Sequence, residues 1–137
     1  MIRGRSDRSW VATFNSASVE QVVIDWAVTL VIGCDGMATT IRLESPFVLT
    51  HGETETLILP EEPQSTAPVL SLLRRPARSL EAFDSGALEV VLDDGWLIAA
   101  PAAEDYEPWG LTRGDGLRIV SVPGGELAVW LPSDEEP

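Results

Sequence analysis

The sequence predicts a mainly β domain: an antiparallel sandwich or partly open barrel of hairpins with one α-helix near residues 65–75. Three observations predict this class. Short segments rich in β-branched and aromatic residues recur along the chain. Turn signals separate these segments at intervals of about 8–12 residues. One stretch alone carries apolar residues at helical spacing. A chain of 137 residues is also long enough to bury one core without disulfides.

Composition divides the chain into an arm, a domain and a tail. Residues 1–18 are rich in Arg and Ser, so we expect a loosely ordered arm, although residues 10–14 could add a first edge strand. Residues 19–131 are expected to form the single β-rich domain. Residues 132–137 are mostly acidic and predict a solvated tail.

Hairpins are expected wherever Asp-Gly, Gly-Gly or a similar turn separates two apolar segments, because glycine supplies the positive φ that tight turns require. The expected neighbouring strands are 22–32 with 37–43, 47–49 with 54–59, 78–83 with 87–92, 87–92 with 96–100, 106–111 with 117–122, and 117–122 with 126–131.

The expected helix follows Pro60 and Pro63, and Ser65 or Thr66 could cap its start. Its apolar stripe consists of Val69, Leu70, Leu72 and Leu73. Arg74 and Arg75 would complement the dipole of its last turn, and Pro76 would end it.

Five tryptophans in 137 residues is a high number, and four of them fall on or beside expected strands. These are Trp26, Trp96, Trp109 and Trp130. Large rings are usually core residues, so we expect replacement of Trp26 or Trp130 by Ala to destabilise the fold by about 3–5 kcal/mol.

The charge is strongly negative and unevenly distributed. The formal net charge is −13, every basic residue is Arg, and residues 80–137 hold thirteen acids against two Arg. Such a field repels the phosphates of nucleic acids, so we expect no nucleic-acid binding. It would attract a basic protein surface, although it could also serve solubility alone.

Residues for catalysis or metal binding are scarce. The single Cys34 and single His51 are not set in any nucleophile, zinc or phosphate-loop motif. We therefore expect no catalytic residue, metal or cofactor. No apolar run reaches the length of a membrane span and no secretory signal is evident. A cytoplasmic, non-membrane protein is the resulting expectation.

The Tyr106-Glu107-Pro108-Trp109 segment is the strongest candidate for partner binding, because two aromatic residues lie in an acidic stretch broken by proline. Trp109 would be the apolar anchor, surrounded by carboxylates that steer a cationic partner. The candidate partner-binding residues are Asp93, Asp94, Glu104, Asp105, Tyr106, Glu107 and Trp109. The alternative for the aromatic pair is a structural role, packing this loop onto the end of the fold.

Several segments of the second half point to a family. They include Val90–Gly95, Tyr106–Trp109, Gly116–Val120 and, most specifically, the ending Pro-Gly-Gly-Glu-Leu-Ala-Val-Trp at 123–130. With matching segments near Trp26 and Pro46, the chain resembles, over residues 20–131, a small acidic domain of unknown function found mainly in actinobacteria. The resemblance implies no catalytic residues. By class analogy, such domains look like the immunity proteins of bacterial toxin systems.

Two functions compete at this stage. The first is a non-catalytic interaction domain that binds a basic protein surface, with immunity to a toxin as its most specific form. The second is a small-ligand-binding or enzymatic β-domain with a Trp-lined pocket. The sequence also leaves homo-oligomerisation open.

Overall fold

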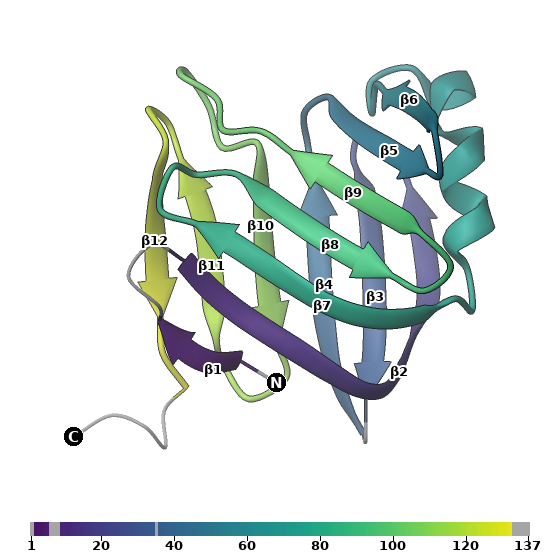
Figure 1. Cartoon of the computed structure of the whole chain (residues 1–137). Coiled ribbons are helices and arrows are strands. Elements are labelled where there is room, and N and C mark those ends of the chain that lie inside the picture. Colours follow the sequence, from purple (N-terminus) through teal and green to yellow (C-terminus); the bar gives the residue numbers. More distant parts are fainter. Residues whose placement is uncertain (1, 6–8, 35, 133–137) are drawn as a thin grey trace.

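The computed structural model describes residues 2–5, 9–34 and 36–132, and in them it shows twelve strands and one helix (Figure 1). The mainly β class with one helix is confirmed, and the sheet does not close into a barrel. The elements are β1 Ile2–Arg5, β2 Ser9–Ile24, β3 Val28–Cys34, β4 Met37–Leu43, β5 Phe47–His51, β6 Thr54–Ile58, η1 Pro63–Leu72, β7 Pro76–Phe83, β8 Leu88–Leu92, β9 Trp96–Ala100, β10 Trp109–Arg113, β11 Arg118–Val122 and β12 Glu126–Trp130.

One continuous antiparallel sheet folds back on itself to make two layers. The strand order is β12-β11-β10-β4-β3-β2-β7-β8-β9-β5-β6, and β1 pairs with β2 outside this path. In Figure 1, β7, β8 and β9 run diagonally across the front of β10, β4 and β3. We call the sheet from β12 to β3 the first layer and the sheet from β7 to β6 the second layer.

Strand β2 belongs to both layers. Residues 9–13 and 17–18 pair with β7, whereas residues 18–24 pair with β3. The register shifts between Thr13 and Ala17, and Ser16 takes a positive φ of 54°. Such an irregularity bends a strand and lets it leave one layer for the other. The expectation of a loose arm over 1–18 therefore needs correction, because residues 9–18 form the first half of the longest strand. Residues 6–8, and 133–137 of the expected tail, lie outside the described residues.

All six expected neighbours form antiparallel pairs. The first expected strand, 22–32, is divided, because residues 22–24 end β2 and β3 begins at Val28. In the β8–β9 turn, Asp94 and Gly95 both have positive φ, at 56° and 78°, as a tight Asp-Gly turn requires. The expected strand at 106–111 begins instead at Trp109, after the exposed acidic loop.

The helix differs from its prediction in type and position. It is a 3-10 helix from Pro63 to Leu72, not an α-helix over 65–75. Pro68 lies inside it and has no N–H to donate, which disfavours regular α-helical bonding. Neither Ser65 nor Thr66 caps its start, and no basic residue lies in its last turn. No helix in the described part of the chain is long and apolar enough to cross a membrane.

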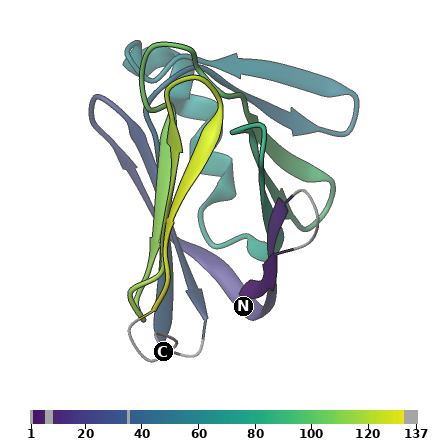
Figure 2. The same cartoon turned by 90° about the vertical axis from the view of Figure 1, so that its left-hand side faces the viewer.

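Both layers contribute to one apolar core, and the helix adds Val69 and Leu72 to it. In Figure 2 the helix lies between the two layers, on the side away from the viewer. Trp109, which the sequence suggested as a partner anchor, is fully buried, whereas Trp26 and Trp130 were the tryptophans predicted to be core residues. The prediction was wrong for Trp26, which is 80% exposed, and for Trp130, which is 51% exposed.

The two layers meet again at what we call the interlayer junction, formed by Gly86, Ala102, Trp109, Ser121 and Gly125. The carbonyl oxygen of Gly86 accepts hydrogen bonds from Trp109 Nε1 (2.9 Å) and Ser121 Oγ (2.8 Å). A Cβ on Gly125 would lie 2.7 Å from the oxygen of Ser85. The β7–β8 turn of the second layer is therefore packed directly onto the β11–β12 turn of the first.

Candidate functional site

An acidic cleft lies at the end of the first layer, beside the loop that precedes β10. Its volume is about 390 Å³. Three segments line it, the end of β4, the link from β6 to the helix, and the loop at Tyr106. The lining residues are Glu44, Ser45, Pro46, Leu59, Pro60, Glu61, Glu62 and Tyr106.

Hydrogen bonds to the backbone hold the cleft walls in place. The N–H of Glu44 donates to the oxygen of Pro108 at 2.8 Å, which ties the end of β4 to the Tyr106 loop. On the opposite wall, Ser65 Oγ accepts from the N–H of Leu59 (2.9 Å) and donates to its carbonyl oxygen (2.8 Å). Glu62 also donates to Leu59 at 2.8 Å. The glutamates are thus carried by fixed backbone.

The cleft combines carboxylates with one aromatic ring. Glu44, Glu61 and Glu62 are exposed, and Tyr106 is 52% exposed. Glu104, Asp105 and Glu107 are exposed on the same loop as Tyr106. An aromatic face next to carboxylates can hold an Arg or Lys side chain by cation–π contact and charge pairing.

Trp109 cannot be the exposed anchor that the sequence suggested. It is the first residue of β10, and its ring points into the core with 0% exposure. Its Nε1–H is used by the interlayer junction, so the ring has no surface to offer a partner. The alternative structural role for this residue is the correct one, and Tyr106 is the exposed aromatic residue of the pair.

Asp93 and Asp94 lie elsewhere. They form the β8–β9 turn, at the opposite end of β9 from the Tyr106 loop. Asp93 pairs with Arg75 at 3.5 Å, and Asp94 lies 3.8 Å from His51 Nε2. The predicted acidic residues therefore form two separate groups.

Glu44, Glu61 and Glu62 were missed by sequence reasoning. The available signal was an acid next to a proline or one residue away from it, as in Glu44-Ser45-Pro46 and Pro60-Glu61-Glu62-Pro63. Proline at strand ends often marks exposed turns. The meeting of these two turns with Tyr106 depends on the sheet order, which no local pattern reveals.

Trp26 stands on a rigid turn near this end of the first layer. The Ala27 N–H donates to Asp25 Oδ1 at 2.8 Å, and this bond, aided by Arg42, lowers the pKa of Asp25. Arg42 lies 3.5 Å from Asp25 and 3.8 Å from Glu44. Register places Val28 opposite Leu43, so the turn is one strand away from Glu44.

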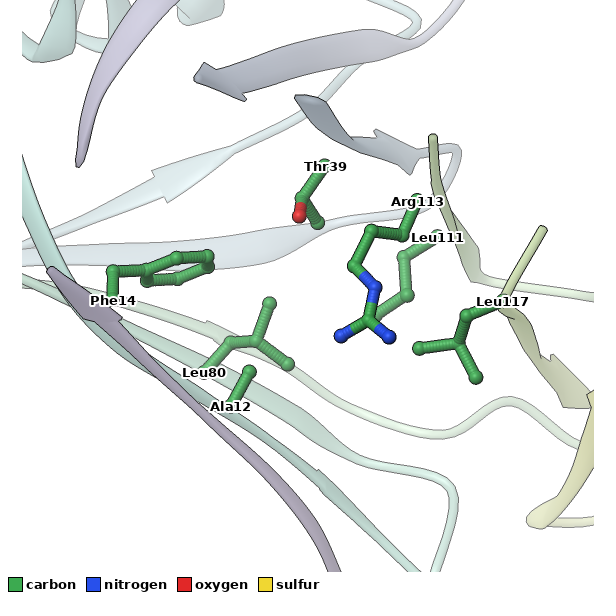
Figure 3. Close-up of a pocket in the computed structure, with 7 residues that line it drawn as sticks. All are labelled: Ala12, Phe14, Thr39, Leu80, Leu111, Arg113 and Leu117. Atoms are coloured by element: carbon green, nitrogen blue, oxygen red, sulfur yellow. The ribbon is translucent and has the colours of Figure 1, made fainter. Parts of the chain in front are cut away.

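One cavity that the described residues form between the layers is too small for a ligand. It measures about 10 Å³, enough for about one water molecule. Figure 3 shows Arg113 of the first layer pointing across it toward Leu80 and Ala12 of the second. No tryptophan lines it. A small-ligand site in this cavity is thus not supported.

His51 and the acids near it do not form a recognisable metal centre. The His51 ring is stacked on Trp96, with centroids 4.0 Å apart. Within residues 2–5, 9–34 and 36–132, no three or more His, Cys, Asp or Glu side chains are grouped to hold a metal ion.

Comparison with known proteins gives a family but no activity. No curated protein and no solved structure matches this chain significantly. A model of a family of unknown function, DUF6188, matches residues 10–131, which include all of β2 except its first residue and every later strand. The chain therefore belongs to this family of unknown function, DUF6188.

Proposed function

We propose that this protein is a binding domain for a basic protein surface and that the acidic cleft beside Tyr106 is its contact site. The observation that carries the proposal is the half-exposed ring of Tyr106 beside Glu44, Glu61 and Glu62 in a cleft of about 390 Å³. Binding, not catalysis, is the proposed activity.

The charge of the chain supports the proposal. The net charge of −13 gives a long-range field that accelerates encounter with a cationic partner. Around the cleft, acids of the N-terminal half (Glu44, Glu61 and Glu62) join acids of the loop (Glu104, Asp105 and Glu107). The two groups are far apart in the sequence, but they meet at the cleft and add their negative charge there.

Charge alone gives little affinity, because an exposed ion pair contributes only about 0–1 kcal/mol. Tyr106 would add the apolar contact, with a cationic side chain of the partner stacked on its ring. The same chemistry occurs inside this molecule, where Arg75 lies 5.1 Å from the ring of Trp96 and Arg118 lies 5.0 Å from the ring of Trp130.

The most specific form of the proposal is an immunity protein that neutralises a basic toxin in the cytoplasm. Its support is the acidic charge together with the class analogy drawn from the sequence. A neighbouring gene that encodes a secreted protein with a basic C-terminal toxin domain would favour this form. If no such gene is found, the basic partner is expected to be a protein other than a toxin.

The test begins with isolation of a partner by affinity capture from the native host, followed by binding kinetics. We expect Tyr106→Ala to speed dissociation, because it removes the apolar contact. We expect the double variant Glu61→Gln/Glu62→Gln to slow association and to weaken its salt dependence.

The matched control is Glu53→Gln/Glu55→Gln, which removes the same charge from exposed positions at the other end of β6. If this control slows association as much as the cleft variant does, the effect is one of net charge and the cleft is not the site. A captured partner that binds Tyr106→Ala as tightly as the unmodified chain would also reject the proposal.

A further inference from the structure

The outer face of the first layer has a central band without carboxylates, although Glu20 lies against Gly33 beside it. Two rows of outward-facing residues cross it from β2 to β12, and neither contains Asp or Glu. One row is Val23, Thr29, Arg42, Gly110, Val120 and Ala128; the other is Gln21, Val31, Thr40, Thr112, Arg118 and Trp130.

A depression of about 240 Å³ lies in the middle of this face, above Gly110. Val120 contributes to its floor and is only 5% exposed, although it faces outward. Thr40, Thr112, Arg42 and Arg118 line its sides.

The fold does not require glycine at position 110. Gly110 is not among the residues with positive φ, and a Cβ there would meet its nearest atom, Val120 Cγ2, at an ordinary 3.6 Å. Glycine inside a strand weakens it, and often marks a place where a ligand or another backbone approaches closely. What glycine provides here is the open space above the strand.

Opposite charges occupy opposite ends of the depression. Glu44 and Glu107 lie at one end, since Glu44 is hydrogen-bonded to Pro108. Arg118 lies at the other end, paired across the strands with Thr112. Strand geometry separates the rows of Glu44 and Arg118 by roughly 13 Å, a distance that long side chains reduce.

Arg118 is positioned without being neutralised. Its guanidinium lies over the ring of Trp130 at 5.0 Å, and it forms no salt bridge with a carboxylate among the residues described. Glu107 at the other end likewise forms no salt bridge with a described Arg. Each is available to a ligand of opposite charge.

We propose that this depression binds a small zwitterion of dipeptide size. The ligand carboxylate would accept hydrogen bonds from Arg118, and the ligand ammonium would donate to Glu107, because Arg42 and Glu44 already pair with each other at 3.8 Å. An extended dipeptide spans about 7 Å, which suits the shortened distance between the two ends. The site is distinct from the acidic cleft, although Glu44 borders both.

The probe is L-alanyl-L-alanine, titrated into ¹⁵N-labelled protein while the amide shifts are followed. We expect saturable shifts at Gly110, Thr112 and Val120. We expect the N-acetylated and the C-amidated dipeptide each to bind about tenfold more weakly than the free dipeptide, because each lacks one charge-assisted contact. Equal binding of the blocked forms, or no saturation with the free dipeptide, would overturn the proposal.

Variants separate the site from a surface effect. Gly110→Val fills the depression on a strand that suits valine, and Arg118→Gln removes the carboxylate contact. Gly110→Val should abolish the shifts and Arg118→Gln should weaken binding about tenfold, and both should leave the amide spectrum of the second layer unchanged. Arg78→Gln, an exposed Arg on β7, is the matched control and should bind normally. If Gly110→Val and Arg118→Gln bind the dipeptide as the unmodified chain does, the depression is not a site.

Discussion

The acidic cleft and the interlayer junction lie next to each other, and one short segment supplies an aromatic residue to both. Tyr106 is half exposed in the cleft, whereas Trp109, three residues later, is fully buried in the junction. The cleft has exposed carboxylates on its walls, and in the junction the Gly86 oxygen accepts two buried hydrogen bonds. The difference shows that the start of a strand, not the local composition, decides which aromatic residue can meet a partner.

The most severe way to break the junction is Trp109→Ala. We expect it to destabilise the fold by about 3–5 kcal/mol, because it empties a site in the core and removes one of the two donors to Gly86. Trp109→Phe keeps most of the ring and loses only the N–H, so it should cost less, about 1–2 kcal/mol. Urea unfolding measures both. A loss below about 1 kcal/mol for Trp109→Ala would show that the layers do not depend on this contact.

Gly125→Ala changes the β11–β12 turn of the junction, and we expect it to lower the free energy of unfolding by about 2–4 kcal/mol. Its φ is +91°, and the new Cβ would lie 2.7 Å from the Ser85 oxygen. Gly124→Ala is the control, because it has a similar φ of +92° but no atom within 4 Å of its Cβ. The difference between their midpoints of thermal unfolding measures the effect of the close contact between position 125 and the Ser85 oxygen. Equal midpoints would mean that the turns can separate at no cost.

The cleft and the junction also differ in how far the sequence predicts them. Each hairpin was predictable because its signal is local, as in Asp94-Gly95. The junction was not, because Gly86 and Gly125 are distant in sequence and meet only through the folding of the sheet. The cleft was predictable in part, through Tyr106 and its acidic neighbours. Its other wall comes from the end of β4 and from the link after β6.

Arg113 and Asp115 form a partly buried charge pair at the β10–β11 turn of the first layer. Arg113 Nε donates to Asp115 Oδ1 at 2.9 Å, and chiefly this side-chain bonding lowers the pKa of Asp115. We expect Asp115→Asn to cost about 1–2 kcal/mol at pH 7.

The pH dependence of this effect follows from the direction of the shift. The pKa of Asp115 is lower in the folded than in the unfolded chain, where it is about 3.9. Its contribution is therefore present above that pH and is lost as the pH falls through the folded pKa. The stability difference between the unmodified chain and Asp115→Asn should shrink in acid. A difference that stays constant from pH 7 to about pH 3 would contradict this assignment.

Trp26→Ala should have the smallest effect on stability, below about 0.5 kcal/mol, because the ring is 80% exposed and little of it leaves water on folding. This expectation reverses the one drawn from the sequence, which placed Trp26 inside a long strand over 22–32. The strand is interrupted because Asp25 accepts a hydrogen bond from the N–H of Ala27 and sets a turn there. Asp25→Ala should therefore destabilise more than Trp26→Ala, although the aspartate is the smaller side chain.

Urea unfolding of both variants, measured beside Trp109→Ala, compares an exposed and a buried tryptophan on one scale. A loss above about 1 kcal/mol for Trp26→Ala would mean that the ring is covered in solution. A loss near zero leaves a large apolar side chain in water, one strand away from the acidic cleft, where it is available to a partner.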